Sequence, residues 1–209
     1  IAEGWYEAQY NGIDMEREVS KLTANDNYQA LRIYCSSWWR MRARDINRGH
    51  VRQVIERMTV EGKSNSRKRH VKGCIHGAIT WGIEQGLIKG ITVSPAFGIK
   101  VSRIEDKKPE ILTLSEIRKL LQSAQEIEHP WYAMWAGALL TGMRSGELYA
   151  LEWKDIDWDN RRLFVSKSWN GRLKQYTSTK AGYWREVPIS DELERLLRDL
   201  QAGAGDRKW

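Results

Sequence analysis

The interval between apolar residues changes once along this chain, and that change limits the folds it can adopt. Up to about Leu151 the apolar residues recur at intervals of three and four, which is the period of an amphipathic helix. Beyond that point the interval becomes two, and short strands are expected over 163–167, 175–179 and 185–189. The pattern therefore predicts a mainly α protein with a small antiparallel β-sheet, which is an α+β fold.

The first half of the chain predicts a small helical bundle. One helix is expected over 23–44, and a second is expected to begin after a cap at Asp45 or Asn47. A third helix is expected from about residue 64 to about residue 85. Each of these stretches has one apolar stripe and a polar face that is rich in arginine, so the helices are expected to pack around a shared core.

A polar stretch without periodicity divides the chain. Residues 99–110 are charged and carry no apolar period, so they are expected to link two domains. The first domain would span 1–98, with an extension over 1–20. The second would span 111–209 and open with a capping box at Thr113, followed by an apolar helical pattern.

Positive charge is concentrated in the first half. The net charge is +7, and residues 1–108 hold 19 Lys and Arg against 12 Asp and Glu, whereas 109–209 hold 15 of each class. The excess is largest between Arg32 and Lys72, where 12 basic residues face three acidic ones. A polyanion is the partner that this charge predicts; a solvated basic face and an anionic membrane surface are the alternatives. The residues expected to contact this polyanion are Arg40, Arg44, Arg67, Lys68, Arg69 and Lys72.

Other features argue against several classes of protein. The longest charge-free apolar run, 129–143, has 15 residues, and a membrane-spanning helix needs about 18 or more. The N-terminus is not a signal peptide and does not begin with Met, so the chain is expected to be a piece of something longer. Cys35 and Cys74 fit neither a disulfide framework nor a zinc spacing. No metal and no cofactor are expected, and a reducing, cytoplasmic compartment fits best.

The most specific stretch runs from Leu140 to Ile156, where an apolar helix is followed by one arginine between two glycines, Gly142 and Gly146. An arginine in such surroundings is costly unless an anion or a carboxylate pairs with it. The residues alone leave two interpretations open. Glu147 could neutralise Arg144 as a structural ion pair, or the planar guanidinium could bind a phosphate.

Part of the chain resembles the tyrosine recombinases, the phage integrase family. The resemblance to the amino-terminal half of their catalytic domain rests on TGMRSGELYALEWKDIDWDNRRL and, after it, STKAGYWREVPIS. Upstream, similarity extends to GLIKGITVSPAFGIK and LTLSEIRKLL. The resemblance covers about residues 20–200 and implies a helical, SAM-like core-binding domain followed by a partial catalytic domain.

The resemblance also implies roles for three residues. Arg144 is similar to the first catalytic arginine of the family, which holds the non-bridging oxygens of the scissile phosphate, and Glu147 would orient that arginine. Lys180 matches the hairpin lysine that protonates the departing 5′ oxygen. The implied partner is double-stranded DNA at a crossover site, on which the full-length recombinase would act as a homo-tetramer.

The sequence departs from the family pattern after the lysine. The family's His-x-x-Arg box and nucleophilic tyrosine would follow Lys180, but all four histidines precede Arg144, and neither Tyr176 nor Tyr183 is assigned as nucleophile. The chain is therefore expected to be an inactive fragment of a site-specific recombinase, which binds duplex DNA without cleaving it. The alternatives are a non-enzymatic double-stranded DNA-binding protein, such as a naturally truncated competitor of an integrase, and a structural or RNA-binding helical module.

Overall fold

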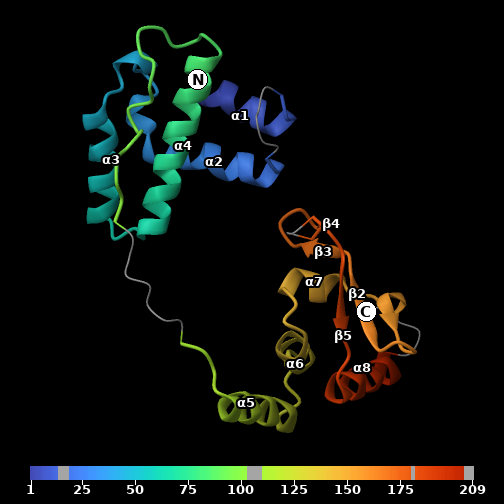
Figure 1. Ribbon diagram of the computed structural model, residues 1–209. Coiled ribbons are helices and arrows are strands. Elements are labelled where there is room, and N and C mark those ends of the chain that lie inside the picture. Colours follow the sequence, from blue (N-terminus) through green and yellow to red (C-terminus); the bar gives the residue numbers. More distant parts are fainter. Residues whose placement is uncertain (14–18, 103–109, 180–181, 205–209) are drawn as a thin grey trace. The chain divides into compact units, whose positions relative to one another are not determined.

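The computed structural model shows two units, Ile1–Lys108 and Pro109–Trp209 (Figure 1). Each unit has a hydrophobic core of its own. Most of the linker expected over 99–110 lies outside the described residues. At its start, however, Ile99 is buried in the core of the first unit. The structure describes residues 1–13, 19–102, 110–179 and 182–204.

The first unit is a helical bundle, as the sequence predicts. Its helix α4 contacts α1, α2 and α3 (Figure 1). The buried side of α4 supplies much of the core, including Val71, Cys74 and Ile75. The described elements are α1 (Ala2–Asn11), α2 (Lys21–Tyr34), the 3₁₀ turns η1 (Ser36–Trp38) and η2 (Ala43–Asp45), α3 (Arg48–Val60) and α4 (Asn65–Glu84).

Polar side chains set the beginnings of α3 and α4. Asn47 Oδ1 accepts hydrogen bonds from the backbone N–H groups of Gly49 at 2.9 Å and His50 at 3.2 Å. Ser64 Oγ accepts from the backbone N–H of Arg67 at 3.2 Å. Of the two caps considered for the second helix, Asn47 is therefore the one used, because its side chain satisfies backbone donors that have no partner in the helix.

The prediction of one helix over 23–44 is wrong in its second half. Helix α2 ends at Tyr34, and two 3₁₀ turns replace its expected continuation. Two serines follow Cys35, and serine is a weaker helix former than leucine or alanine. The chain forms a tighter turn there, in which the Trp38 N–H donates to Cys35 O at 2.9 Å. Arg40 and Arg44 therefore do not share the face of a helix.

The second unit combines helices with two small antiparallel sheets, so the predicted α+β fold is confirmed. One sheet has the order β1-β2-β5, and the other pairs β3 with β4. Helix α8 supplies Leu193 and Leu197 to the core that the first sheet also lines. The described elements are α5 (Leu114–Glu126), α6 (Tyr132–Thr141), α7 (Ser145–Ala150), η3 (Trp153–Asp155), β1 (Ile156–Asp157), β2 (Arg162–Val165), β3 (Lys167–Asn170), β4 (Gln175–Ser178), β5 (Arg185–Pro188) and α8 (Asp191–Ala204).

The strand expected over 163–167 is in fact two strands. Ser166 separates β2, which pairs with β5, from β3, which pairs with β4. Leu163 faces Val187 in the first pair, and Lys167 faces Ser178 in the second. The alternation of apolar residues identified β2 correctly, but it could not show that the chain changes sheets, because partner choice depends on distant strands.

Helix α6 is apolar around most of its circumference, yet only Ala136 and Gly137 are buried. Leu139 and Leu140 are exposed. A helix of this composition is normally buried, so α6 gives the second unit an apolar surface. Among the described residues, no helix has both the length and the apolar character needed to cross a membrane.

Candidate functional site

The candidate site lies where α6 ends and α7 begins. Gly142 closes α6 in the left-handed region, with φ of 64°, and its N–H bonds to Ala138 O at 2.9 Å. Arg144 then takes the extended N-cap position of α7. Its backbone N–H donates to Glu147 Oε2 at 3.0 Å, and its backbone oxygen accepts from the Glu147 N–H at 2.9 Å. The turn therefore fixes the backbone from which the Arg144 side chain projects.

Glu147 is the centre of the site. Its side chain is 1% exposed, and its two carboxylate oxygens accept every hydrogen bond that joins the site together. Arg144 Nη1 donates to Oε1 at 3.1 Å, while Arg185 donates from Nη1 to Oε1 at 3.1 Å and from Nη2 to Oε2 at 2.7 Å. The Arg185 hydrogen bonds, together with those from Arg144, outweigh burial and lower the pKa of Glu147 to about 2.

The Arg144 side chain remains accessible although it is paired. It is 58% exposed, and Glu147 engages it through one guanidinium nitrogen. The two interpretations that the sequence left open are thus compatible: Glu147 holds the arginine, and the exposed part of the fork can meet an anion. The structure brings Arg144 and Glu147 together, as their spacing predicts.

Sequence reasoning missed Arg185. This residue starts β5, 38 positions after Glu147 in the sequence, and its side chain contacts the Glu147 carboxylate on α7. A signal was available in the alternation of Arg185, Val187 and Ile189, because the latter two are buried. An arginine on the inward face of a strand requires a carboxylate nearby.

Gly146 allows α7 to approach β3 closely. A methyl group at this position would lie 2.5 Å from Ser168 Oγ and 2.8 Å from the backbone carbonyl oxygen of Trp169. The Ser168 hydroxyl could turn away, but the carbonyl belongs to the paired β3–β4 sheet. The second glycine of the arginine stretch is therefore explained by packing between protein elements.

We expect Gly146→Ala to lower the free energy of unfolding by ~1–3 kcal/mol, as overpacking does elsewhere. Alanine has a higher helix propensity than glycine, by up to ~1 kcal/mol, and this alone would raise stability. A net loss of stability therefore reports the collision of the new methyl group with β3. Urea unfolding followed by tryptophan fluorescence measures it. Gly171→Ala is the control, because its methyl group would meet nothing within 4 Å. Equal stability of the two variants would contradict the expected collision.

Lys180 lies outside the described residues, so its position stays untested. The residues on either side are tied together: Thr179 Oγ1 donates to Tyr183 O at 2.8 Å, and Gly182 N–H donates to Thr179 O at 2.9 Å. These contacts join the end of β4 to the segment that leads into β5.

Lys167, another lysine of the same hairpin, is fully engaged by carboxylates. Its Nζ lies 2.9 Å from Glu152 Oε2 and 3.3 Å from Asp155 Oδ2. Burial alone would lower the pKa of Lys167, but the hydrogen bonds to these two acids outweigh it and raise the pKa above its ordinary value. Lys167 is therefore suited to hold β3 against η3 and poorly suited to release a proton.

The basic residues of the first unit differ in accessibility. Arg40, Arg44 and Arg69 are exposed. Lys68, in contrast, is buried and donates to Thr59 Oγ1 at 3.2 Å, which makes it the least suited of the six predicted residues to contact a phosphate.

The other predicted DNA contacts also have partners within the unit. Arg67 lies over the Tyr34 ring, with 5.4 Å from its guanidinium carbon to the ring centroid. Lys72 Nζ donates to Ile99 O at 3.1 Å, and Arg69 Nη1 donates to Ser102 O at 3.2 Å. These contacts attach the segment after the helical bundle to α4, so the charge also has a structural use. Their assignment to DNA stays a prediction.

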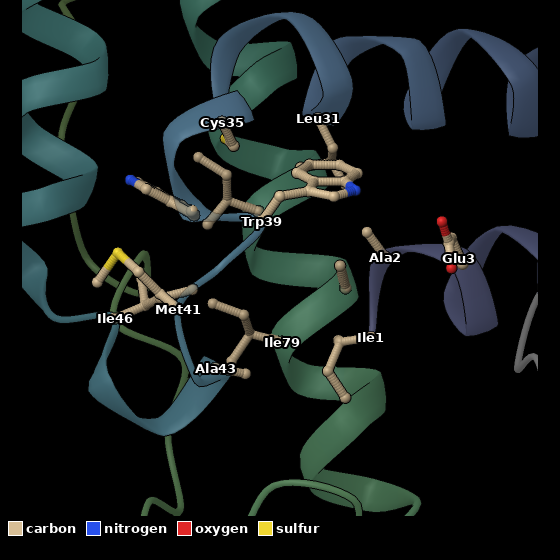
Figure 2. A pocket seen from close by; sticks show the side chains of 13 residues that line it. Ile1, Ala2, Glu3, Leu31, Cys35, Trp39, Met41, Ala43, Ile46 and Ile79 are labelled. Carbon is tan, nitrogen blue, oxygen red and sulfur yellow. The ribbon is translucent and has the colours of Figure 1, made fainter.

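An apolar pocket of about 270 Å³ opens in the first unit between α1, the turns after α2, and α4 (Figure 2). Glu3 is the one charged residue of its lining, and Cys35 is among the others. Burial raises the pKa of the Cys35 thiol to about 12, so the thiol is unreactive at neutral pH. Such a lining does not suit a phosphate.

Comparison with known proteins gives matches for both units. The pattern described as "Phage integrase family" matches residues 110–208. A protein called "Tyrosine recombinase XerC-like", from Caldanaerobacter subterraneus subsp. tengcongensis, is 24% identical over 206 residues, which cover 90% of this chain and 51% of that protein. The "ICEBs1 integrase" of Bacillus subtilis is 30% identical over 107 residues, or 50% of this chain and 29% of that protein. The chain thus spans about half or less of the length of these relatives.

Solved structures show the same fold. The integrase of the Tn1549 transposon, in complex with transposon right end DNA, has a TM-score of 0.77 at 20% identity, with 99% of this chain and 66% of that one covered. A λ integrase tetramer bound to a Holliday junction has a TM-score of 0.73 at 19% identity, with 97% and 55% covered. Identities this low show a shared fold and nothing finer about the site.

Proposed function

Because this chain belongs to the phage integrase family of tyrosine recombinases, we propose that it binds duplex DNA at a crossover site in site-specific recombination. The observation that carries the proposal is the cluster of Arg144, Glu147 and Arg185, inside the matched region. In this cluster Glu147 binds the guanidinium of Arg144, which remains accessible to solvent. A guanidinium is the group that suits a phosphodiester.

In the proposed chemistry, Arg144 stabilises the scissile phosphate. Attack on a phosphodiester increases the negative charge on its non-bridging oxygens, and a cationic donor already in place there lowers the barrier without a metal. Lys180 would then protonate the departing 5′ oxygen, as a general acid. Glu147 does not react: its low pKa keeps it ionised, so that it orients Arg144.

We further propose that residues 1–209 alone bind DNA without cutting it. In this sequence no His-x-x-Arg follows Arg144, and no tyrosine after it is assigned as nucleophile. Tyr176 lies edge-on against Trp169, with ring centroids 5.3 Å apart, and is not assigned as nucleophile. Covalent catalysis would need a tyrosine supplied by a longer form of the protein.

The proposal extends to partners and location. The full-length recombinase would act as a homo-tetramer on its DNA, as the λ integrase neighbour is a tetramer on a Holliday junction. It would act in the cytoplasm, where the free, buried Cys35 and Cys74 remain reduced. Among the described residues, no group of three or more His, Cys, Asp or Glu could hold a metal ion, and the proposed chemistry requires none.

A salt titration tests the binding. With ~4–6 phosphate contacts and a slope of about −0.9 per contact, affinity for a random-sequence duplex should fall roughly 10²–10³-fold between 50 and 200 mM salt. Fluorescence anisotropy with a labelled 30-base-pair duplex measures this, and double-stranded RNA of the same length serves as competitor. A flat salt response would rule out binding through phosphates, and preference for RNA would favour the RNA-binding alternative.

Variants then locate the contacts. Replacing Arg40, Arg44 and Arg69 by glutamine should reduce the salt slope by about one for each residue that contacts a phosphate. Lys68→Met is the matched control, because its ammonium group is buried, and its slope should stay close to that of the unchanged chain. An equal reduction by Lys68→Met would show that general charge, and not this set of exposed arginines, binds the DNA.

A non-enzymatic double-stranded DNA-binding protein is the second candidate, favoured by the absence of an assigned nucleophile from the printed sequence. Both candidates bind DNA, so binding does not separate them. Reading the gene beyond the codon for Trp209 separates the two candidates. A His-x-x-Arg box and a tyrosine there would indicate a recombinase, and an immediate stop codon would indicate the DNA-binding protein.

A further inference from the structure

Arg185 binds the same buried carboxylate as Arg144 does. It is the first residue of β5, its side chain is 31% exposed, and it contacts both oxygens of Glu147, at 3.1 and 2.7 Å. Arg144, by comparison, reaches one oxygen through its side chain, at 3.1 Å. The two-pronged contact fixes the plane of the carboxylate as well as its position.

Arg144 alone could not keep Glu147 ionised as securely as Arg185 does. A carboxylate that is 1% exposed has lost its hydration, and the cost must be offset by hydrogen bonds and charge. Arg144 is more than half exposed, so water weakens its attraction for Glu147. Arg185 is less exposed and makes the shorter, double contact. The orientation of the carboxylate therefore depends mainly on Arg185.

We infer that Arg185 is a positioning residue: it fixes Glu147, and through Glu147 it sets where the Arg144 guanidinium can meet a phosphate. The part of this inference that concerns DNA rests on the proposed function.

A purely structural role for Arg185 makes a different prediction. If the residue only stabilised the fold, its replacement would lower stability but leave the order of the Arg144 side chain unchanged. Two readouts separate the possibilities: the guanidinium signals of Arg144, which need no DNA, and the coupling between the two arginines in DNA binding. The variants are Arg185→Met, which removes the contact, and Arg185→Lys, which keeps the charge but cannot reproduce the fork.

NMR provides the first readout. In the unchanged chain, the Nη–H resonance of Arg144 that donates to Glu147 should be resolved, because the contact slows rotation of the guanidinium. It should broaden beyond detection in Arg185→Met and in Arg185→Lys, while the pKa of Glu147 rises. Arg162→Met is the matched control: Arg162 donates to Glu186 at 2.6 Å between β2 and β5, so the same charge and a similar pair are lost. An unchanged Arg144 resonance in both Arg185 variants would overturn the inference, and if Arg185→Met does not fold, Arg185→Lys decides.

A double-mutant cycle provides the second readout. Arg185→Met should weaken duplex binding by about threefold to tenfold beyond Arg162→Met when Arg144 is present, and by less than twofold when Arg144 is methionine. Equal losses in both backgrounds would show that Arg185 does not act through Arg144. If the unchanged chain shows no salt-dependent DNA binding, the proposed function fails, whereas the NMR result still decides the role of Arg185.

Discussion

Replacing Glu147 by alanine is expected to lower the free energy of unfolding by about 3 kcal/mol, in the range found when one partner of a buried ion pair is removed. The loss arises because Arg144 and Arg185 then lose the carboxylate to which both donate. It should lie at the lower end of that range, since both arginines reach solvent. Urea unfolding measures the change.

The control for this prediction is Glu186→Ala. Glu186, on β5, pairs with Arg162 on the neighbouring strand β2, but both side chains are substantially exposed, at 34% for Glu186 and 52% for Arg162. An exposed pair contributes ~1 kcal/mol or less, so this variant should lose little stability. Similar losses of stability in the two variants would mean that burial of Glu147 adds nothing to its contribution to the free energy of unfolding.

The contribution of Glu147 should also depend on pH. Its pKa falls from an ordinary value of 4.5 to about 2 in the folded chain, so the folded state binds its proton less readily than the unfolded state. The stabilisation is therefore fully present above pH 4.5 and is lost as the pH falls towards 2. The difference in stability between the unchanged chain and Glu147→Gln should shrink over that interval; a difference independent of pH would contradict the ionised pairing.

The second large effect concerns cleavage, in a form of the protein that contains a nucleophile. Arg144→Ala should slow cleavage by roughly 10²–10³-fold, as removal of one preplaced donor does in other active sites. Arg144→Lys should not restore the rate, because an ammonium group cannot make the two-pronged contact of a guanidinium. Single-turnover cleavage of a nicked suicide substrate measures both variants.

A sulfur substrate separates Arg144 from Lys180. If Lys180 protonates the 5′ leaving oxygen, Lys180→Ala should be slow on ordinary DNA and largely recover when that bridging oxygen is replaced by sulfur, which departs without a proton. Arg144→Ala should not recover, because its defect is in charge stabilisation. Equal rescue of both, or of neither, would show that another group is the acid. Lys174 would then be tested before Lys167, whose ammonium is bound by Glu152 and Asp155.

Local signals in the sequence predicted much of this structure. The Thr113 capping box is present, with Thr113 N–H donating to Glu116 Oε2 at 2.7 Å, and the cap at Asn47 was among the expected ones. The pairing of Arg144 with Glu147 follows from their spacing of three residues. These features involve residues within one helical turn, so the chain specifies them before any distant contact forms.

Features that depend on distant contacts were not predictable in the same way. The helix expected over 23–44 ends at Tyr34, and the expected strand 163–167 divides at Ser166, because packing and strand pairing override local periodicity. The burial of Lys68 likewise depends on Thr59, which belongs to another helix. A count of basic residues cannot distinguish a lysine that faces solvent from one that faces the core.

The sequence by itself determined the α+β fold class, the Thr113 cap and the excess of positive charge in the first half, and it gave the contact between Arg144 and Glu147 as one of two interpretations. Tertiary structure alone decided that Arg185 joins them, since α7 packs against β3, β5 pairs with β2, and Arg185 meets Glu147 across 38 positions of the sequence. It also decided which basic residues reach solvent. Both outcomes depend on how elements far apart in the chain pack together, and sheet register and burial are set only when that packing is complete.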